Sequence, residues 1–236
     1  SSFYAVYHGP KGLENIAKRI VYLRKLLEKN LRTIGYQLDN LDRFDGIDVF
    51  SKIAPKVLQL AEDAGYNLRI LPLGSNISNA QGFGVTLDEL STEKEINILT
   101  GIFAEAFGEK DTQLYQKISF DNDKLFKELP LREDSWLQQS VFHKFRSETE
   151  LLRYITRLSN KDFSLVHGMI PLGSCTMKLN AASELYPINW REFSSIHPFA
   201  PSDQVEGYKI LFENLEKWLS SCTGFDAVSL QPNAGS

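Results

Sequence analysis

One short stretch, residues 169–180, concentrates the side chains that are best suited to chemistry. It runs from an apolar start through a Gly-Ser turn, and it carries the hydroxyls of Ser174 and Thr176, the thiol of Cys175 and the amine of Lys178. An apolar run that opens into a polar loop is a place where binding groups collect, because the loop stands at the end of a rigid element. We therefore predict that these four side chains belong to a substrate-binding or active-site loop.

A catalytic role for the Cys175 thiol is one interpretation of this loop. A thiol nucleophile needs a nearby base, and the chain offers four histidines: His8, His143, His167 and His197. No sequence spacing ties any of them to Cys175, so a half-buried thiol in a polar loop is the simpler alternative. A cysteine-dependent hydrolase would be sensitive to thiol reagents and would need no cofactor. His167 and His197, on either side of the loop, are candidates for acid–base chemistry or for a structural role.

A second candidate site lies where a predicted strand, residues 225–230, leads into the sequence Asn233-Ala234-Gly235-Ser236. A turn of small residues between a strand and the start of a helix offers backbone N–H groups, and here also a hydroxyl, to an anion. Taken alone, the same pattern is that of an ordinary turn. The sequence therefore indicates an anion-binding turn only in combination with other signals.

The elements that must position these two sites follow from the spacing of apolar residues. Apolar residues spaced three and four positions apart predict amphipathic helices. A Ser or Thr followed three positions later by Glu predicts a capping box at the start of a helix, and a glycine after the last apolar residue predicts its end. Residues 76–84 are polar and contain glycine, so we expect a loop there. The expected helices cover residues 10–35, 52–64, 92–108, 147–158 and 202–224, and the expected strands cover residues 36–41, 46–50, 68–72, 85–87 and 225–230.

The apolar periodicity fades over residues 109–146, where charged and aromatic residues alternate. We expect a connector there, with a small α/β domain over residues 1–108 and a second body that starts at residue 147 and runs to residue 236. Tyr4, Tyr7 and His8 precede the long helix and either line a cleft at a domain junction or pack between domains.

Composition excludes several classes of protein. The net charge is −4 without a basic block, which argues against a nucleic-acid partner. No apolar run approaches the about 20 residues that a membrane-spanning helix needs. Two cysteines are too few for a disulfide framework and lack metal-ligand spacing, so we expect free thiols in a reducing compartment and no metal site. No targeting peptide is visible in the sequence.

The motifs at residues 169–180 and 231–236, taken together, resemble the pyridoxal-phosphate-dependent glycine decarboxylases, the P-proteins of the glycine cleavage system. One departure is Asn233-Ala234-Gly235-Ser236, where many members of the family have Asn-Ser-Gly-Ala, so the hydroxyl has moved by two positions. The resemblance extends along nearly the whole chain and includes residues 3–10, 82–89, 146–154, 196–199 and 207–208.

This resemblance implies an α/β fold of fold-type I, similar to aspartate aminotransferase and present only in part. The family has two such halves, and the chain would begin at the end of the first half and stop at the start of the second, catalytic half. The Schiff-base lysine would lie beyond the chain end, so no catalytic residue is expected here and Lys178 is not that lysine. Ala234, Gly235 and Ser236 would bind the pyridoxal phosphate cofactor.

The implied activity is that of a glycine dehydrogenase (aminomethyl-transferring), an oxidoreductase that decarboxylates glycine and passes the aminomethyl group to the lipoyl arm of the H-protein. The complete protein would be a homodimer, cytoplasmic in a bacterium or in the mitochondrial matrix of a eukaryote, and the fragment alone would be inactive. The alternative is a non-enzymatic interaction or scaffold domain of the same architecture. A sequence downstream that contains a His-Lys-Thr-like stretch would favour the enzyme.

Overall fold

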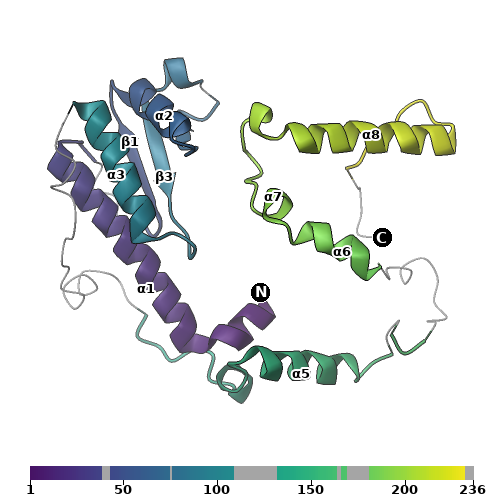
Figure 1. Ribbon diagram of the computed structural model, residues 1–236. Coiled ribbons are helices and arrows are strands. Elements are labelled where there is room, and N and C mark those ends of the chain that lie inside the picture. The colour runs from purple at the N-terminus through teal and green to yellow at the C-terminus, as the bar shows by residue number, and fades with distance from the viewer. Residues whose placement is uncertain (39–42, 75, 109–131, 164–165, 169–180, 232–236) are drawn as a thin grey trace. The chain divides into compact units, whose positions relative to one another are not determined.

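A computed structural model describes residues 1–38, 43–74, 76–108, 132–163, 166–168 and 181–231 (Figure 1). The chain divides into two compact units, residues 1–154 and 155–236. This division falls within helix α5 (Glu148–Ser159), downstream of the expected connector. Because residues 109–131 lie outside the described part, the domain bounds proposed from the sequence stay a prediction.

The first unit is built on the long helix α1 (Ser2–Ile34). The sequence predicted a helix from residue 10, but the structure begins it at Ser2 and bends it at Gly9, where φ is 62° and ψ is −178°. The predicted end is confirmed, because Gly35 adopts the left-handed conformation with φ 114° and its N–H caps the carbonyls of Leu31 and Arg32.

Three strands form an antiparallel sheet in the order β1-β3-β2: β1 (Gly46–Phe50), β2 (Arg69–Leu71) and β3 (Gly82–Thr86). The strands predicted near β1 and β2 are confirmed. The loop predicted to extend over residues 82–84 is wrong, because these residues belong to β3, the central strand of the sheet. Glycine has little intrinsic strand preference, and pairing with both neighbouring strands overrides it here.

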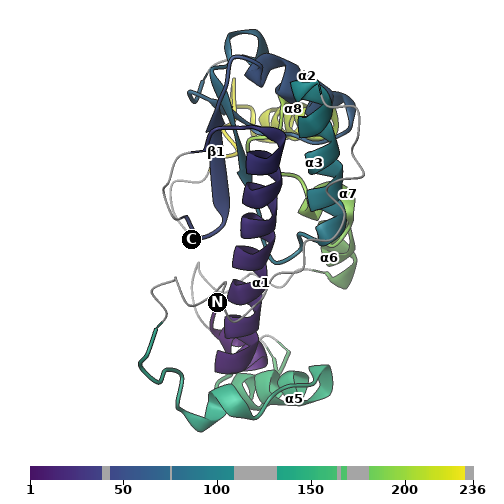
Figure 2. The ribbon, with the colours of Figure 1, turned by 90° about the vertical axis from the view of Figure 1, so that its left-hand side faces the viewer.

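Helices α2 (Ala54–Asp63) and α3 (Glu93–Phe107) also belong to the first unit. They pack with α1 against the sheet, and Figure 2 shows α1 and α3 running alongside each other. Alternate strand residues point into one core with these helices. Its most buried large side chains include Leu27, Leu31, Val49, Phe83, Ile96 and Phe103.

Two local predictions in this unit have different outcomes. The capping box of α3 is confirmed, since the Thr92 hydroxyl accepts from the backbone N–H of Lys94 and the Glu95 carboxylate accepts from the N–H of Thr92. The strand expected over residues 36–41 is absent from residues 36–38, and residues 39–41 lie outside the described part. Tyr36 is instead a buried anchor whose hydroxyl donates to the carbonyl of Phe103 at 2.9 Å.

The first unit also contains the 3-10 turns η1 (Ile77–Asn79) and η3 (Ser140–His143), and η3 leads into α5. Ser147 and Glu150 form the capping box predicted for that helix. The backbone N–H of Glu150 donates to the Ser147 hydroxyl at 3.3 Å, and the Glu150 carboxylate accepts from the N–H of Ser147 at 3.3 Å.

The second unit continues α5 and contains the helices α6 (Ala182–Ile188), α7 (Arg191–Ser194) and α8 (Glu206–Thr223). The predicted start of the last helix is wrong, because Ser202–Gln204 form a separate 3-10 turn, η4, and α8 begins after it. Its predicted end is confirmed at Gly224, where φ is 77°.

Residues 225–230, predicted as a strand, are irregular. A strand is stable only beside another strand, and the described residues of the second unit provide none. None of the side chains described after residue 155 is buried, so this unit has amphipathic helices but, in its described part, no closed core. Every helix in the described ranges is too short or too polar to cross a bilayer.

Candidate functional site

The residues of both predicted sites lie outside the described part of the chain, and their placement stays a prediction. The structure describes the segments that lead to the first site from either side and the segment that leads into the second. The residues concerned are Ser174, Cys175, Thr176 and Lys178 of the loop and Ala234, Gly235 and Ser236 of the turn.

The segment before the loop leaves α5 through a short turn. The N–H of Asn160 donates to the carbonyl of Thr156 at 2.9 Å, and Nε2 of His167 lies 3.2 Å from Oδ1 of Asn160. An amide oxygen only accepts, so Nε2 is the donor in this contact. His167 is therefore held by the end of α5, at the entrance to the predicted loop.

The segment after the loop is ordered by side chains from residues 193–208. Nδ1 of His197 accepts from the backbone N–H of Phe199 at 3.1 Å, which leaves the proton of the neutral ring on Nε2. The hydroxyl of Tyr208 on α8 donates to the carbonyl of Phe193 on α7 at 2.9 Å, and their rings meet edge to face at 5.6 Å. These contacts connect α7 to α8 and fix the orientation of His197.

The approach to the predicted cofactor turn starts at the end of α8. The Thr223 hydroxyl donates to the carbonyl of Leu219 at 2.7 Å, and the N–H of Gln231 donates to the Ser229 hydroxyl at 3.3 Å. Hydroxyl groups thus satisfy backbone groups on both sides of residues 225–230. The described chain follows this segment as far as Gln231.

The two other histidines lie in the first unit. The ring of His8 packs on Tyr4 at 4.3 Å and on Tyr7 at 5.3 Å, and Nε2 of His143 lies 2.9 Å from the carbonyl oxygen of Leu137. Packing against aromatic rings thus holds His8 in place, and a hydrogen bond to the backbone holds His143. The structure places neither ring beside a described nucleophile.

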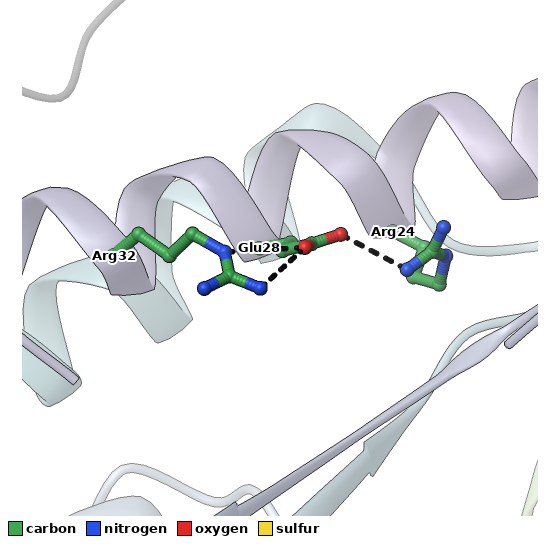
Figure 3. A network of polar contacts seen from close by, with 3 residues as sticks. All are labelled: Arg24, Glu28 and Arg32. Carbon is green, nitrogen blue, oxygen red and sulfur yellow. Dashed lines mark hydrogen bonds and ion pairs between the residues drawn. The ribbon is translucent and has the colours of Figure 1, made fainter. Parts of the chain in front are cut away.

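Charged side chains on α1 form structural ion pairs along the helix. Glu28 accepts from Arg24 at 3.0 Å and from the guanidinium of Arg32 at 3.2 and 3.0 Å, one helical turn away on each side (Figure 3). The side chain of Arg24 is only 3% exposed, so this pairing keeps a buried charge compensated. Within the described ranges, no group of His, Cys, Asp and Glu side chains is arranged to hold a metal ion.

The pKa shifts of described residues also arise from structure. The Thr92 hydroxyl, hydrogen-bonded to the Glu95 carboxylate, lowers the pKa of Glu95, and the backbone N–H of Arg146 does the same for Glu150. Burial raises the pKa of Tyr36. Two of these groups belong to helix caps and the third to the core, so none of the three marks a reactive site.

One arrangement that the sequence analysis missed is a contact between Arg146 and the first turns of α1. Nη1 of Arg146 lies 2.6 Å from the carbonyl oxygen of Val6. The local signal in the sequence was Pro10, which has no backbone N–H and therefore leaves a carbonyl of the preceding turn without its helical donor.

Comparison with known proteins places this geometry in context. The sequence model of the family described as "Glycine cleavage system P-protein" matches residues 1–103. The glycine dehydrogenase (decarboxylating) of Prochlorococcus marinus strain NATL2A is 57% identical over 236 residues, which is 100% of this chain and 24% of that protein. The proteins of the same name from Synechococcus sp. strain RCC307 and from a Synechocystis species are 47% and 46% identical over all of this chain. The chain thus spans about a quarter of the length of the curated relatives that it matches.

Proposed function

This chain belongs to the family of the glycine cleavage system P-protein, and from that premise we propose that it forms part of an enzyme that decarboxylates glycine. The remaining aminomethyl group would pass to the lipoyl arm of the H-protein. One observation carries the proposal: the similarity runs through all 236 residues and therefore includes the loop at 169–180 and the turn at 231–236. Because the chain spans about a quarter of the length of its relatives, we assign the activity to the complete protein and expect the isolated chain to be inactive.

The cofactor that fits this reaction is pyridoxal phosphate, in a fold of the aspartate-aminotransferase type. Ala234, Gly235 and Ser236 would hold its phosphate through backbone N–H groups and one hydroxyl. When bound, the cofactor withdraws the electron pair that remains on carbon after carbon dioxide leaves. The small side chains of the turn support the assignment, because they permit the backbone to approach an anion closely.

The loop at residues 169–180 would bind the carboxylate of glycine. Ser174 and Thr176 each bring a hydroxyl donor, and Lys178 brings a positive charge, which together complement a small anion. His167 and His197 flank this loop in the sequence, which makes them candidates for acid–base chemistry beside the bound glycine.

The proposal is tested on the complete protein by the release of labelled carbon dioxide from carboxyl-labelled glycine, in the presence of lipoylated H-protein and pyridoxal phosphate. We expect S174A and T176A to lower kcat/KM by about tenfold or more, as loss of a hydrogen bond to a charged group does. Ser183 on α6 is exposed, so S183A is the matched control and should retain full activity. Failure to release carbon dioxide under these conditions would overturn the proposal.

The alternative of a non-enzymatic interaction domain predicts a different complete protein. Its reading frame would contain no lysine suited to bind pyridoxal phosphate, and purified material would show no cofactor absorbance. For the enzyme we also propose a homodimer. The relatives named above are cyanobacterial, which favours the bacterial cytoplasm of the two expected compartments.

A further inference from the structure

Helix α1 is interrupted near its start by the pair Gly9-Pro10. Proline has no backbone N–H, so Pro10 donates no hydrogen bond to Val6, the residue four positions earlier. Gly9 has φ 62° and ψ −178°, a conformation essentially restricted to glycine, and it turns the chain out of the helical path. The carbonyls that end the first helical segment therefore need donors from elsewhere.

The guanidinium of Arg146 supplies those donors. Its Nη1 donates to the carbonyl of Val6 at 2.6 Å and to the carbonyl of Tyr7 at 3.2 Å. Its Nη2 donates to the carbonyl of Phe142 in η3. One planar fork thus joins two segments that are far apart in the sequence, and its positive charge lies where the dipole of a helix end favours a cation.

Gly9 is also the residue that makes room for this contact. A Cβ atom at Gly9 would overlap Nη2 of Arg146 and would lie 2.5 Å from the carbonyl oxygen of Phe142. Two features therefore require glycine at this position: its backbone conformation and the guanidinium that lies against it.

The contact lies directly before α5. The backbone N–H of Arg146 donates to the carboxylate of Glu150 at 3.2 Å, within the capping box of that helix. The ring of Tyr154 stacks on Phe145 at 4.3 Å and meets Phe3 of α1 edge to face at 6.2 Å. Arg146 therefore links the break in α1 to the first turns of α5.

We infer that Gly9, Pro10 and Arg146 form a joint that fixes the start of α5 on the first turns of α1. The joint thereby holds the first turn of α5 within the first unit. Arg146 acts as a positioning residue, since its partners in this joint are backbone carbonyls. The joint is independent of the reaction proposed above, because its geometry involves no substrate or cofactor.

Hydrogen–deuterium exchange of the full 236-residue chain tests the joint. The N–H of Phe142, which donates to the carbonyl of Gln139 at 3.0 Å, reports on η3. We expect R146Q to speed its exchange by about tenfold or more, as loss of charge-assisted bonds implies. R146K keeps the charge but lacks the planar fork, so it should behave like R146Q. R153Q removes an exposed arginine on α5 and is the matched control.

The core provides the internal reference, because the buried residues of β3 belong to a cluster formed by residues 23–106. Exchange in β3 should stay unchanged in R146Q. G9A should reproduce the effect of R146Q, and the double variant G9A/R146Q should add little to either, because both disrupt one contact. Equal exchange of Phe142 in R146Q and R153Q, or a loss of protection that extends evenly into β3, would overturn the inference.

Discussion

The side-chain Nδ2 of Asn30 on α1 donates a hydrogen bond to the hydroxyl of Thr100 on α3 at 3.0 Å, within the core of the first unit. The two residues are 0% and 1% exposed. The Thr100 hydroxyl donates in turn to the carbonyl of Ile96 at 2.7 Å. Because a buried polar group is costly unless it is hydrogen-bonded, this pair favours one register between the two helices.

Removing one member of this pair should destabilise the chain. T100V keeps the shape of the side chain but takes the acceptor from Asn30, and we expect a loss of about 1–3 kcal/mol in the free energy of unfolding. Urea unfolding followed by circular dichroism measures it. T33V, at an exposed position of α1, is the control for a threonine-to-valine change in a helix. An unfolding midpoint for T100V equal to that of T33V would show that the pair contributes nothing.

Two glycines of β3 should respond differently to alanine. Gly84 pairs with Asp48 on one side and Arg69 on the other, and the two charged side chains meet above it in an ion pair. A Cβ at Gly84 would lie 2.6 Å from Nη2 of Arg69 and 2.7 Å from Oδ1 of Asp48, both at the movable ends of side chains. A Cβ at Gly82 would overlap the backbone carbonyl oxygen of Val49, which is fixed in the sheet.

We therefore expect G82A to cost about 1–3 kcal/mol, as overpacking against rigid atoms does. G84A should cost less than about 1 kcal/mol, the usual contribution of a partly exposed ion pair. The two variants serve as each other's control in urea unfolding. A larger loss for G84A than for G82A would contradict this account of the sheet.

The sequence predicted the helix ends of the first unit because local signals determine them. Gly35 and Gly108 end α1 and α3 in the left-handed conformation, and Thr92 begins α3 with its capping box. The central strand was predicted only in its second part, at residues 85–86, because Gly82 and Gly84 carry no strand signal of their own. Their strand conformation depends on β1 and β2, which lie on either side of them in space.

The sequence indicated which residues could belong to the candidate sites, but not how they are arranged in space. The loop and the turn were found from short motifs, whereas Arg146 contacts Val6 across 140 positions of sequence, a distance over which no local pattern gives information. The predicted strand at 225–230 failed for a related reason, since a strand requires a partner that its own residues do not specify.

The capping box of α3 should make the stability of the first unit depend on pH. The Thr92 hydroxyl bound to the carboxylate holds the pKa of Glu95 below its ordinary value of 4.5. A carboxyl group with a lowered pKa in the folded state contributes stability above its unfolded pKa, and this contribution is lost as the pH falls through the folded value. T92A should therefore lower the unfolding free energy by about 1 kcal/mol at neutral pH, through loss of the cap.

The difference between T92A and the parent chain should shrink below the ordinary carboxyl pKa, where the Glu95 carboxylate becomes protonated in both. Unfolding curves at neutral and at acidic pH measure this change. T86A alters an exposed threonine at the end of β3 and should show no such pH dependence. A T92A effect that is constant across the acidic range would remove Glu95 from the explanation.

The predicted cofactor turn gives the test that bears most directly on function. In the complete protein, G235V should weaken binding of pyridoxal phosphate by about tenfold or more, because a branched side chain keeps the backbone N–H groups from approaching the phosphate. Titration of the cofactor-free protein, followed by visible absorbance, measures the affinity.

Gly207 at the start of α8 has open space around its Cβ position, so G207V is the control and should bind normally. The isolated chain should show no saturable binding, because the proposed activity belongs to the complete protein and this chain spans about a quarter of the length of its relatives. Unchanged affinity in G235V would exclude the turn as the phosphate site, and saturable binding with a single labelled lysine at Lys178 would make this chain a cofactor-binding module by itself.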